Sequence, residues 1–369
     1  MNWRMMPLGE VSTLQRGFDL PIQNRLEGEI PIYAANGPVG FHNEMRVAGP
    51  GVITGRSGSI GKVHYVEGGY WPLNTSLYVK DFQGNDPKYI YWLLRNLHLD
   101  RFHHGTGVPT LNRNVVHREL VPVPPLSEQR RIAEILDKAD ALRTKRLEAI
   151  TKLDELLQSV FLEMFGDPVT NPKGWSVSKL GEFAEFENGD RSSNYPSKGD
   201  IVSGGVLFLS TKNITDHRLD LRNTQFITEK KFESLSRGKI RKGDLVITLR
   251  GTLGACCIFD GVYDIAFINA QMMIMRPRLG INSVFLHSVI TSSAIQEKIK
   301  SSFTGAAVPQ LTSGGIAELG LYRPPTDLQI RFSEIALMIQ AHRRELCRSS
   351  SLVDDLFHSL QRKGFLGAV

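Results

Sequence analysis

Much of this chain occurs twice, and the duplication constrains the fold more than any single motif does. Val108-Pro109-Thr110-Leu111 returns as Val308-Pro309-Gln310-Leu311, 200 positions later. The same offset holds without a gap for other pairs: Pro124-Pro125 and Pro324-Pro325, Gln129 and Gln329, Arg143 and Arg343, Asp154 and Asp354. A match of this length indicates two copies of one structural unit.

The part of each copy that precedes this shared tail is less well matched. Trp3 corresponds to Trp175 at an offset of 172, whereas Ile53 corresponds to Ile247 at an offset of 194, so the second copy is longer between these points. A constant tail behind a variable body is expected if the tail keeps one geometry while each body reads something different. Duplication followed by drift alone predicts no such contrast.

Each body has the pattern of a β-rich, mixed α/β globule. Short β-branched or aromatic runs are bounded by Gly, Pro and Asn, which is typical of strands. These runs cover residues 51–54, 62–66 and 77–79 in the first copy, and 206–209, 244–248 and 272–275 in the second. Helices are expected over residues 87–99 and 283–301.

Each tail has the pattern of one long helix. Apolar residues recur at spacings of three and four after each Pro-Pro pair, with Ser127 and Asp327 as the expected N-caps. A helix of ~38 residues is ~57 Å long, and its single apolar stripe needs a partner. The two tails can bury both stripes by pairing in antiparallel fashion, related by a pseudo-two-fold axis. The alternative is that each helix packs on its own body.

The expected class is therefore α+β, with two tandem bodies and two long helices. The boundaries that follow are a first body at 1–125, a helix at 126–166, a second body at 167–325 and a helix at 326–369.

Composition limits the classes of function. The chain is 41% hydrophobic but has no apolar run of the ~20 residues that span a bilayer, and it lacks a signal-peptide core, so we expect a cytoplasmic protein. The net charge of +6 favours an anionic partner without identifying it. No metal site is expected, because neither the three cysteines nor His103-His104 have further ligands at suitable spacing.

The motifs of nucleotide-binding and methyl-transferring enzymes are missing. Gly58-Ser59-Ile60-Gly61-Lys62-Val63 superficially resembles a phosphate-binding loop, but Arg56 stands where its first Gly is required and Val63 replaces Ser or Thr. Asp167-Pro168 lacks the second Pro and the aromatic residue of an adenine methyltransferase. We therefore expect no catalysis from the chain itself.

The helix entry Pro124-Pro125-Leu126-Ser127-Glu128-Gln129, continued to Leu136, resembles that of type I restriction–modification specificity subunits. Residues 105–112 and Trp175-x4-Leu180-Gly181 are similar to the family's pattern as well. The resemblance implies two target-recognition domains, each reading a half-site in double-stranded DNA, with the helices as a spacer. It also implies methyltransferase subunits, expected to be two, that methylate adenine with S-adenosylmethionine. A separate restriction and translocase subunit would use ATP and magnesium, and this chain would hold no cofactor.

Candidate contact residues come from polar, Gly-bounded segments, because Lys and Arg favour phosphates while Arg, Asn, Ser and Thr read base edges. The expected DNA-binding residues are Arg56, Ser57, Lys62, Asn112, Arg113, Asn114, Lys212, Asn213, Arg250 and Thr252, with Arg56 and Arg250 at equivalent positions. The expected partner-binding residues are Leu126, Glu128, Gln129 and Gln329. The second copy has Thr326 and Leu328 where the first has Leu126 and Glu128, which puts equal docking of partners at the two copies in doubt.

Two alternatives remain. One is a self-sufficient DNA methyltransferase or nuclease, which methylation of DNA by the purified chain would support. The other is a coiled-coil interaction protein or repressor-like binder, which would not co-purify with a larger subunit that binds S-adenosylmethionine.

Overall fold

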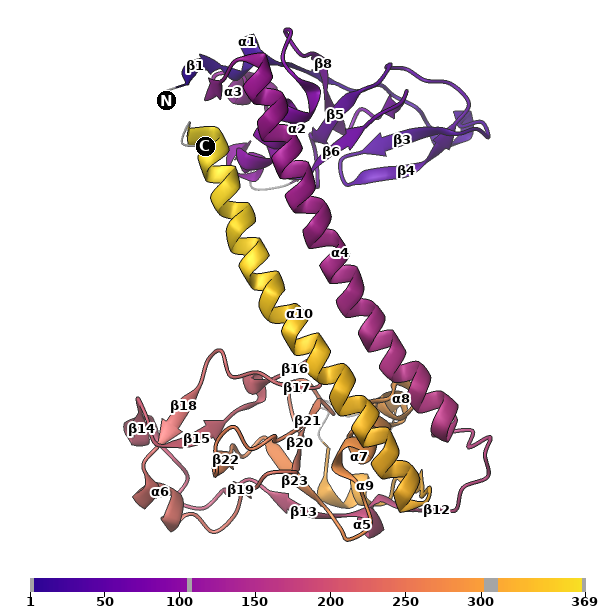
Figure 1. Cartoon of the computed structure of the whole chain (residues 1–369), viewed down its shortest axis with the longest axis vertical. Coiled ribbons are helices and arrows are strands. Elements are labelled where there is room, and N and C mark those ends of the chain that lie inside the picture. The colour runs from indigo at the N-terminus through magenta and orange to yellow at the C-terminus, as the bar shows by residue number, and fades with distance from the viewer. Residues whose placement is uncertain (1–2, 105–107, 302–310, 367–369) are drawn as a thin grey trace. The chain divides into compact units, whose positions relative to one another are not determined.

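The structure is a computed structural model that describes residues 3–104, 108–301 and 311–366. The chain forms two compact units: unit 1 comprises Met1–Ala149 and Leu346–Val369, and unit 2 comprises Ile150–Glu345. Both unit boundaries fall inside the two long helices (Figure 1). Each unit therefore contains one body and part of each long helix. This grouping differs from the four consecutive segments expected from the sequence, in which each helix is a segment of its own.

The body of unit 1 contains two main β-sheets. The antiparallel four-stranded sheet has the order β2-β8-β5-β6, with strands Thr13–Arg16, Ser76–Asp81, Gly51–Gly55 and Val63–Val66. The three-stranded sheet has the order β4-β3-β7, with strands Gly37–His42, Ile30–Ala34 and Trp71–Pro72. The remaining elements are β1 (Arg4–Pro7) paired with β11 (Leu120–Val123), β9 (His103–His104) paired with β10 (Thr110–Leu111), α1 (Leu8–Val11), α2 (Pro87–Asn96), α3 (Arg113–Val116) and the short helices Ile22–Asn24 and Leu99–Phe102.

The body of unit 2 repeats this plan and enlarges it. Its four-stranded sheet has the order β13-β23-β20-β21, with strands Ala184–Asn188, Met272–Pro277, Leu245–Thr248 and Cys256–Ile258. Its second sheet has five strands in the order β14-β18-β15-β22-β19, namely Ile201–Val202, Gln225–Ile227, Val206–Leu209, Ala266–Ile268 and Lys239–Ile240. The remaining elements are the hairpin β16 (Ile214–Thr215) and β17 (Arg218–Leu219), β12 (Val177–Lys179) paired with β24 (Gly320–Tyr322), α5 (Leu180–Phe183), α6 (Glu229–Ser234), α7 (Ser283–Thr291), α8 (Ser293–Ser301), α9 (Ser313–Ala317) and the short helices Lys198–Asp200 and Thr211–Asn213.

The predicted strands are confirmed, but the predicted helix over 283–301 is wrong as a single element. The backbone of Ser292 is extended, with ψ of 143°, and it separates α7 from α8. The Ser292 Oγ accepts a hydrogen bond from the Ile295 backbone N–H at 3.4 Å, so the serine starts the second helix. Helix α2 ends at Asn96, before the expected Leu99, and His98 has a φ of 48° that a helix does not allow.

The two long helices, α4 (Leu126–Phe165) and α10 (Thr326–Leu366), are unbroken as predicted. Each begins one residue before its expected N-cap, so Ser127 and Asp327 lie in the first turn and the N-cap prediction is wrong. In α4 the Pro125 carbonyl accepts hydrogen bonds from the two backbone N–H groups of Glu128 and Gln129. Gly166, with a φ of 80°, ends α4 and donates its N–H to the Leu162 carbonyl.

A buried glutamine fixes the start of each long helix to its own body. The side chains of Gln129 and Gln329 are 2% and 0% exposed. The Gln129 Oε1 accepts a hydrogen bond from the Asp86 backbone N–H at 2.9 Å, and Gln329 accepts one from Asn282 at the same distance. Asp86 and Asn282 are the N-caps of α2 and α7. Each Gln Nε2 also donates to the carbonyl five residues earlier, so both ends of the amide are used.

The two long helices run antiparallel within each unit. In unit 1 the Arg143 Nε lies 2.6 Å from Asp354 Oδ1, and Arg146 contacts Ser349, so residue numbers rise in α4 as they fall in α10. In unit 2 the Arg343 Nε lies 2.9 Å from Asp154 Oδ1. Arg143 and Arg343 are repeat partners, as are Asp154 and Asp354. In unit 1 the arginine comes from α4 and the aspartate from α10, whereas in unit 2 the arginine comes from α10 and the aspartate from α4. The antiparallel pairing of the two helices that the sequence predicts is therefore present within each unit.

The ends of the long helices complete the cores of the bodies. In unit 2, Phe165 at the end of α4 lies 4.9 Å from Phe285 and 5.3 Å from Phe332, measured between ring centroids. In unit 1, Phe365 at the end of α10 lies 5.7 Å from Tyr89. Each core therefore includes aromatic rings from the helix that starts in the other copy.

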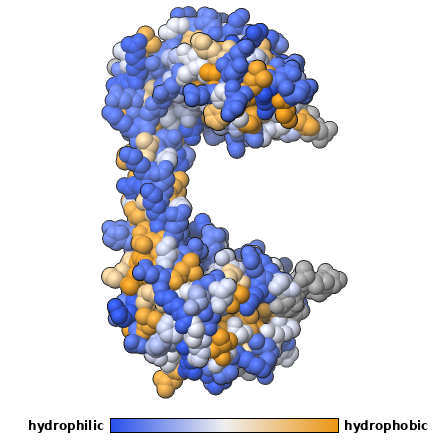
Figure 2. Space-filling view, turned by 90° about the vertical axis from the view of Figure 1, so that its right-hand side faces the viewer, coloured by the Kyte–Doolittle hydropathy of each residue, from blue (hydrophilic) through white to orange (hydrophobic). Residues whose placement is uncertain are grey.

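The predicted apolar stripes are buried only in part. Near the start of α4, Ile132 and Leu136 are buried, because they face the body of unit 1 and its share of α10. Leu142 and Leu147, further along, are 54% and 59% exposed. Hydrophobic side chains accordingly appear on the surface of the helices (Figure 2). Within the described residues, none of the helices is long and apolar enough to span a membrane.

We expect Gln129→Leu to lower the free energy of unfolding by about 2–4 kcal/mol, because it removes the side-chain partner of the partly buried Asp86 N–H and of the buried Pro124 carbonyl. Urea denaturation followed by circular dichroism measures this. Gln158→Leu, at an exposed position of the same helix, is the matched control and should change stability little. Equal stability of the two variants would contradict the proposed role of the buried amide.

Candidate nucleic-acid interface

In unit 1, two segments far apart in sequence meet at one surface. The turn between β5 and β6 lies against the strand that leads into α3. Ser57 forms an isolated β-bridge with Thr110, and the Leu111 N–H donates to the Arg56 carbonyl at 2.8 Å. Residues 56–58 and 110–114 therefore form one continuous region, which includes five of the predicted DNA-binding residues.

The side chains of this region differ in how they are used. Arg56 is half-buried, and its Nε donates to the Asn74 carbonyl at 3.0 Å. Asn112 caps α3 by accepting a hydrogen bond from the Asn114 N–H at 3.0 Å. Lys62, Arg113 and Asn114 are exposed. The exposed cations and amides here are suited to phosphate and base contacts, whereas Arg56 partly supports the turn itself.

The corresponding turn of unit 2 is shorter, and it shifts the arginine. The Leu311 N–H donates to the Leu249 carbonyl at 3.1 Å, as Leu111 does to Arg56. By this contact Arg56 matches buried Leu249, and exposed Arg250 lies one residue further into the turn. The predicted equivalence of Arg56 and Arg250 therefore needs this correction, whose cause is the difference in turn length. Thr252 is exposed in the same turn. Residues 308–310 of the repeated motif, like 105–107 in the first copy, lie outside the described residues.

Lys212 and Asn213 are neighbours with opposite environments. Lys212 is exposed, whereas Asn213 is 3% exposed. The Asn213 Nδ2 donates to the carbonyls of Asp220 and Asn223, both at 3.0 Å, and its Oδ1 accepts from the Ser210 N–H. The structure thus gives Asn213 a role in holding this turn together in place of the predicted DNA contact.

The predicted partner-binding residues also divide. Leu126, 40% exposed, and the half-buried Glu128 lie on the first turn of α4 and can be reached from outside. Gln129 and Gln329 are buried, and their amides bond within the chain. They position the helices in place of the predicted contact with a partner.

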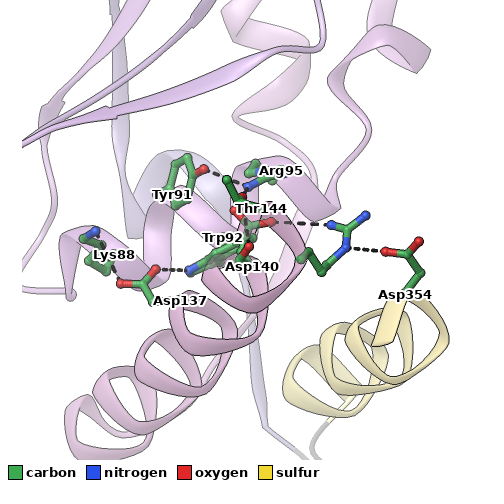
Figure 3. Close-up of polar contacts among 9 residues, drawn as sticks. Lys88, Tyr91, Trp92, Arg95, Asp137, Asp140, Thr144 and Asp354 are labelled. Atoms are coloured by element: carbon green, nitrogen blue, oxygen red, sulfur yellow. Dashed lines mark hydrogen bonds and ion pairs between the residues drawn. The ribbon is translucent and has the colours of Figure 1, made fainter. Parts of the chain in front are cut away.

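A group of polar contacts between α2 and α4 in unit 1 was not found from the sequence (Figure 3). The Trp92 Nε1 donates to Asp137 Oδ1 at 2.8 Å, and the Lys88 Nζ lies 3.3 Å from the other oxygen of that carboxylate. The Arg95 Nη1 donates to the Tyr91 hydroxyl at 2.8 Å and lies 3.4 Å from Asp140. Tryptophan and charged residues recur at helical spacing in the sequence, but the α4 residues that they contact lie 45 or 49 positions away.

Beside these contacts lies a cleft of about 820 Å³. It is bounded by β3, β6, α2 and the part of α4 that belongs to unit 1. His64 lines it; burial, then the charges of Lys62 and Arg95, lowers the pKa of this imidazole, which is therefore neutral at pH 7. The buried His64 Nε2 has no hydrogen-bond partner among the residues that the structure describes.

The described part of the chain contains no group of three or more His, Cys, Asp or Glu side chains placed to hold a metal ion. The features that remain are two repeated loop surfaces and the helices that carry them.

Comparison with known proteins places this arrangement in a family. The sequence model of the type I restriction modification DNA specificity domain matches residues 1–158 and 172–336. The chain belongs to this family. The family supplies the DNA-specificity part of type I restriction–modification systems, which is not the catalytic part.

Several curated relatives are specificity subunits. A putative type I specificity subunit of Mycoplasma pneumoniae, S.MpnORF507P, is 26% identical over 341 residues, covering 88% of this chain and 85% of the relative. The MjaVIII specificity subunit of Methanocaldococcus jannaschii is 22% identical over 266 residues, covering 65% of this chain but only 61% of that protein. The EcoBI specificity subunit of Escherichia coli is 24% identical over 289 residues, covering 70% of this chain and 60% of its own length.

The fold is that of a solved relative. The S subunit of the type I restriction–modification system from M. genitalium superposes with a TM-score of 0.70 at 17% identity, covering 99% of this chain and 96% of that one. The comparison supports two tandem domains with two long helices in one chain.

The neighbouring Lys212 and Asn213 provide a test of the site description. We expect Asn213→Ala to lower the free energy of unfolding by about 1–3 kcal/mol, because the turn loses the buried amide that bonds two of its carbonyls and the Ser210 N–H. Lys212→Ala should leave stability unchanged within about 0.5 kcal/mol, because the side chain is exposed. Thermal and urea unfolding of both variants measure the difference; a stable Asn213→Ala variant would contradict the assignment.

Proposed function

We propose that this chain is the specificity subunit of a type I restriction–modification complex and reads a bipartite site in double-stranded DNA, one half with each body. The observation that carries the proposal is the repeated loop surface. Each unit brings the turn of its four-stranded sheet against the segment that precedes its small helix, α3 or α9, and the two surfaces carry different side chains. Two similar scaffolds with different exposed residues are what two different half-sites require.

The exposed residues suggest how the work is divided. Lys62, Arg113, Lys212 and Arg250 supply positive charge for phosphates, which gives most of the affinity and makes it sensitive to salt. Asn112, Asn114 and Thr252, with Ser57, offer the hydroxyl and amide groups that distinguish base edges in the grooves. Arg56 contributes mainly by supporting the turn.

The long helices serve as the spacer between the half-sites and as the platform for other subunits. The first turn of α4, with exposed Leu126 and half-buried Glu128, is the proposed contact for a methyltransferase subunit. Two methyltransferase subunits and a restriction and translocase subunit would complete the complex. S-adenosylmethionine, ATP and magnesium would belong to those subunits, and the complex would work in the cytoplasm.

The sharpest test of a DNA contact by a single side chain is Arg250→Ala. Because the variant loses one phosphate contact, we expect it to bind the selected target DNA and other duplex DNA more weakly, with a salt dependence whose slope falls by about one, and with little loss of stability because the residue is exposed. The target is first selected from random duplex DNA with the assembled complex, and fluorescence anisotropy is then measured over a range of salt concentrations.

Arg348→Ala, an exposed arginine of α10, is the control and should bind like the wild type. Wild-type affinity and salt dependence of Arg250→Ala would remove Arg250 from the interface. Selection of no DNA sequence at all would contradict the proposed function.

A further inference from the structure

The two units differ at one corner, and in unit 2 a hairpin of the chain itself occupies it. This corner lies between β21 and α7, next to α4. His217, in the turn of the hairpin β16–β17, accepts a hydrogen bond from the Cys256 N–H at 3.2 Å. The His217 carbonyl lies 3.0 Å from His287 Nε2, on α7. The next residue, Arg218, donates to Asp154 Oδ1 of α4 at 2.6 Å.

The positions that receive this hairpin have counterparts in unit 1. Strand register makes Val63 the counterpart of Cys256. Val63 lies opposite Thr54 and Cys256 lies opposite Ile247, and Thr54 and Ile247 are related by the same offset as Arg56 and Leu249. Tyr91 is the counterpart of His287, since each is the fifth residue after the N-cap of its helix.

The carboxylate that anchors the hairpin also has a counterpart, Asp354. In unit 2, Asp154 accepts hydrogen bonds from two arginines, Arg343 and Arg218. In unit 1, Asp354 accepts one from Arg143, and its side chain remains 44% exposed. A second cation can therefore approach Asp354 as Arg218 approaches Asp154.

No hairpin corresponds to β16–β17 in the described part of unit 1, and the cleft lies at this corner. His64 and Tyr91 both line it, along with Tyr33, Thr144 and Glu148. Val63 lines it too, at the position where the Cys256 backbone of unit 2 is bonded to the hairpin. The cleft is thus lined by the counterparts of the residues that hold the hairpin in unit 2, but no hairpin of the described residues fills it.

We propose that this cleft is a docking site for a loop of a partner protein that carries an arginine or lysine. The loop would take the place that the hairpin takes in unit 2, with its cation on Asp354. A polypeptide is favoured as the ligand because the hairpin β16–β17, itself polypeptide, fills the corresponding corner of unit 2. DNA is disfavoured because three carboxylates line the cleft, those of Asp137, Asp140 and Glu148, against two cations, Lys88 and Lys145, of which Lys88 is already paired with Asp137.

The partner that fits is the methyltransferase subunit, and in this respect the inference rests on the proposed function. Two such subunits would then bind with unequal affinity, because only unit 1 offers an open corner. The corner of unit 2 is closed by the chain's own residues.

Filling the cleft tests the proposal. Thr144 and Arg344 are repeat partners, and both are exposed on their helices, so a tryptophan at either position should not disturb the fold. The purified methyltransferase subunit is titrated calorimetrically into the full-length wild type, Thr144→Trp and Arg344→Trp. We expect Thr144→Trp to weaken one of the two binding events about tenfold or more, and Arg344→Trp to leave both near the wild-type values.

A photo-crosslinking amino acid at position 144 gives an independent readout. In the wild-type background it should join to a segment of the methyltransferase subunit that contains Lys or Arg, whereas the same group at position 344 should give no such product.

The outcomes separate the two proposals. Two wild-type binding events that Thr144→Trp leaves unchanged would overturn the docking site and leave the proposed function intact. Absence of binding by the wild type would contradict the proposed function as well. Loss of DNA affinity in Thr144→Trp, with methyltransferase binding preserved, would assign the cleft to DNA and overturn the proposal.

Discussion

The structure depends on aromatic side chains that the long helices insert into the cores of the bodies. Phe161 and Phe165 of α4 belong to the core of unit 2, and Phe357 and Phe365 of α10 belong to the core of unit 1. Truncating a buried phenylalanine to alanine typically costs about 3–5 kcal/mol, so these rings are a large part of the stability of each unit. Neither body has a complete core without the helix that starts in the other copy.

This constraint explains why the tail of the repeat is constant while the body varies. The helix must begin at a buried glutamine, pair with its sibling through the reciprocal contacts Arg143–Asp354 and Arg343–Asp154, and end at a phenylalanine in the other core. An insertion in the tail would disturb all three. An insertion in the body is tolerated at the second sheet, which has three strands in unit 1 and five in unit 2, and unit 2 also gains the hairpin β16–β17.

The sequence was sufficient for the architecture because the repeat and the helical period are properties of local pattern. It predicted two β-rich bodies, two unbroken helices and their antiparallel pairing. It did not predict that Asn213 and Gln129 are buried, because polar residues carry no local sign of the carbonyls they will bond. It also missed the one-residue shift between Arg56 and Arg250, which arises from a shorter turn. The cleft of unit 1 depends on contacts between segments far apart in the chain.

The central claim is that this chain, without catalysis of its own, decides which DNA sequence a methyltransferase modifies. A map of adenine methylation across the genome tests it most directly, in cells that express the complete system and in cells that lack only this chain. The account predicts a methylated motif in two parts, separated by a fixed gap, that disappears when the chain is deleted and the methyltransferase is kept. A motif that persists after deletion, or a motif in one uninterrupted part, would contradict it.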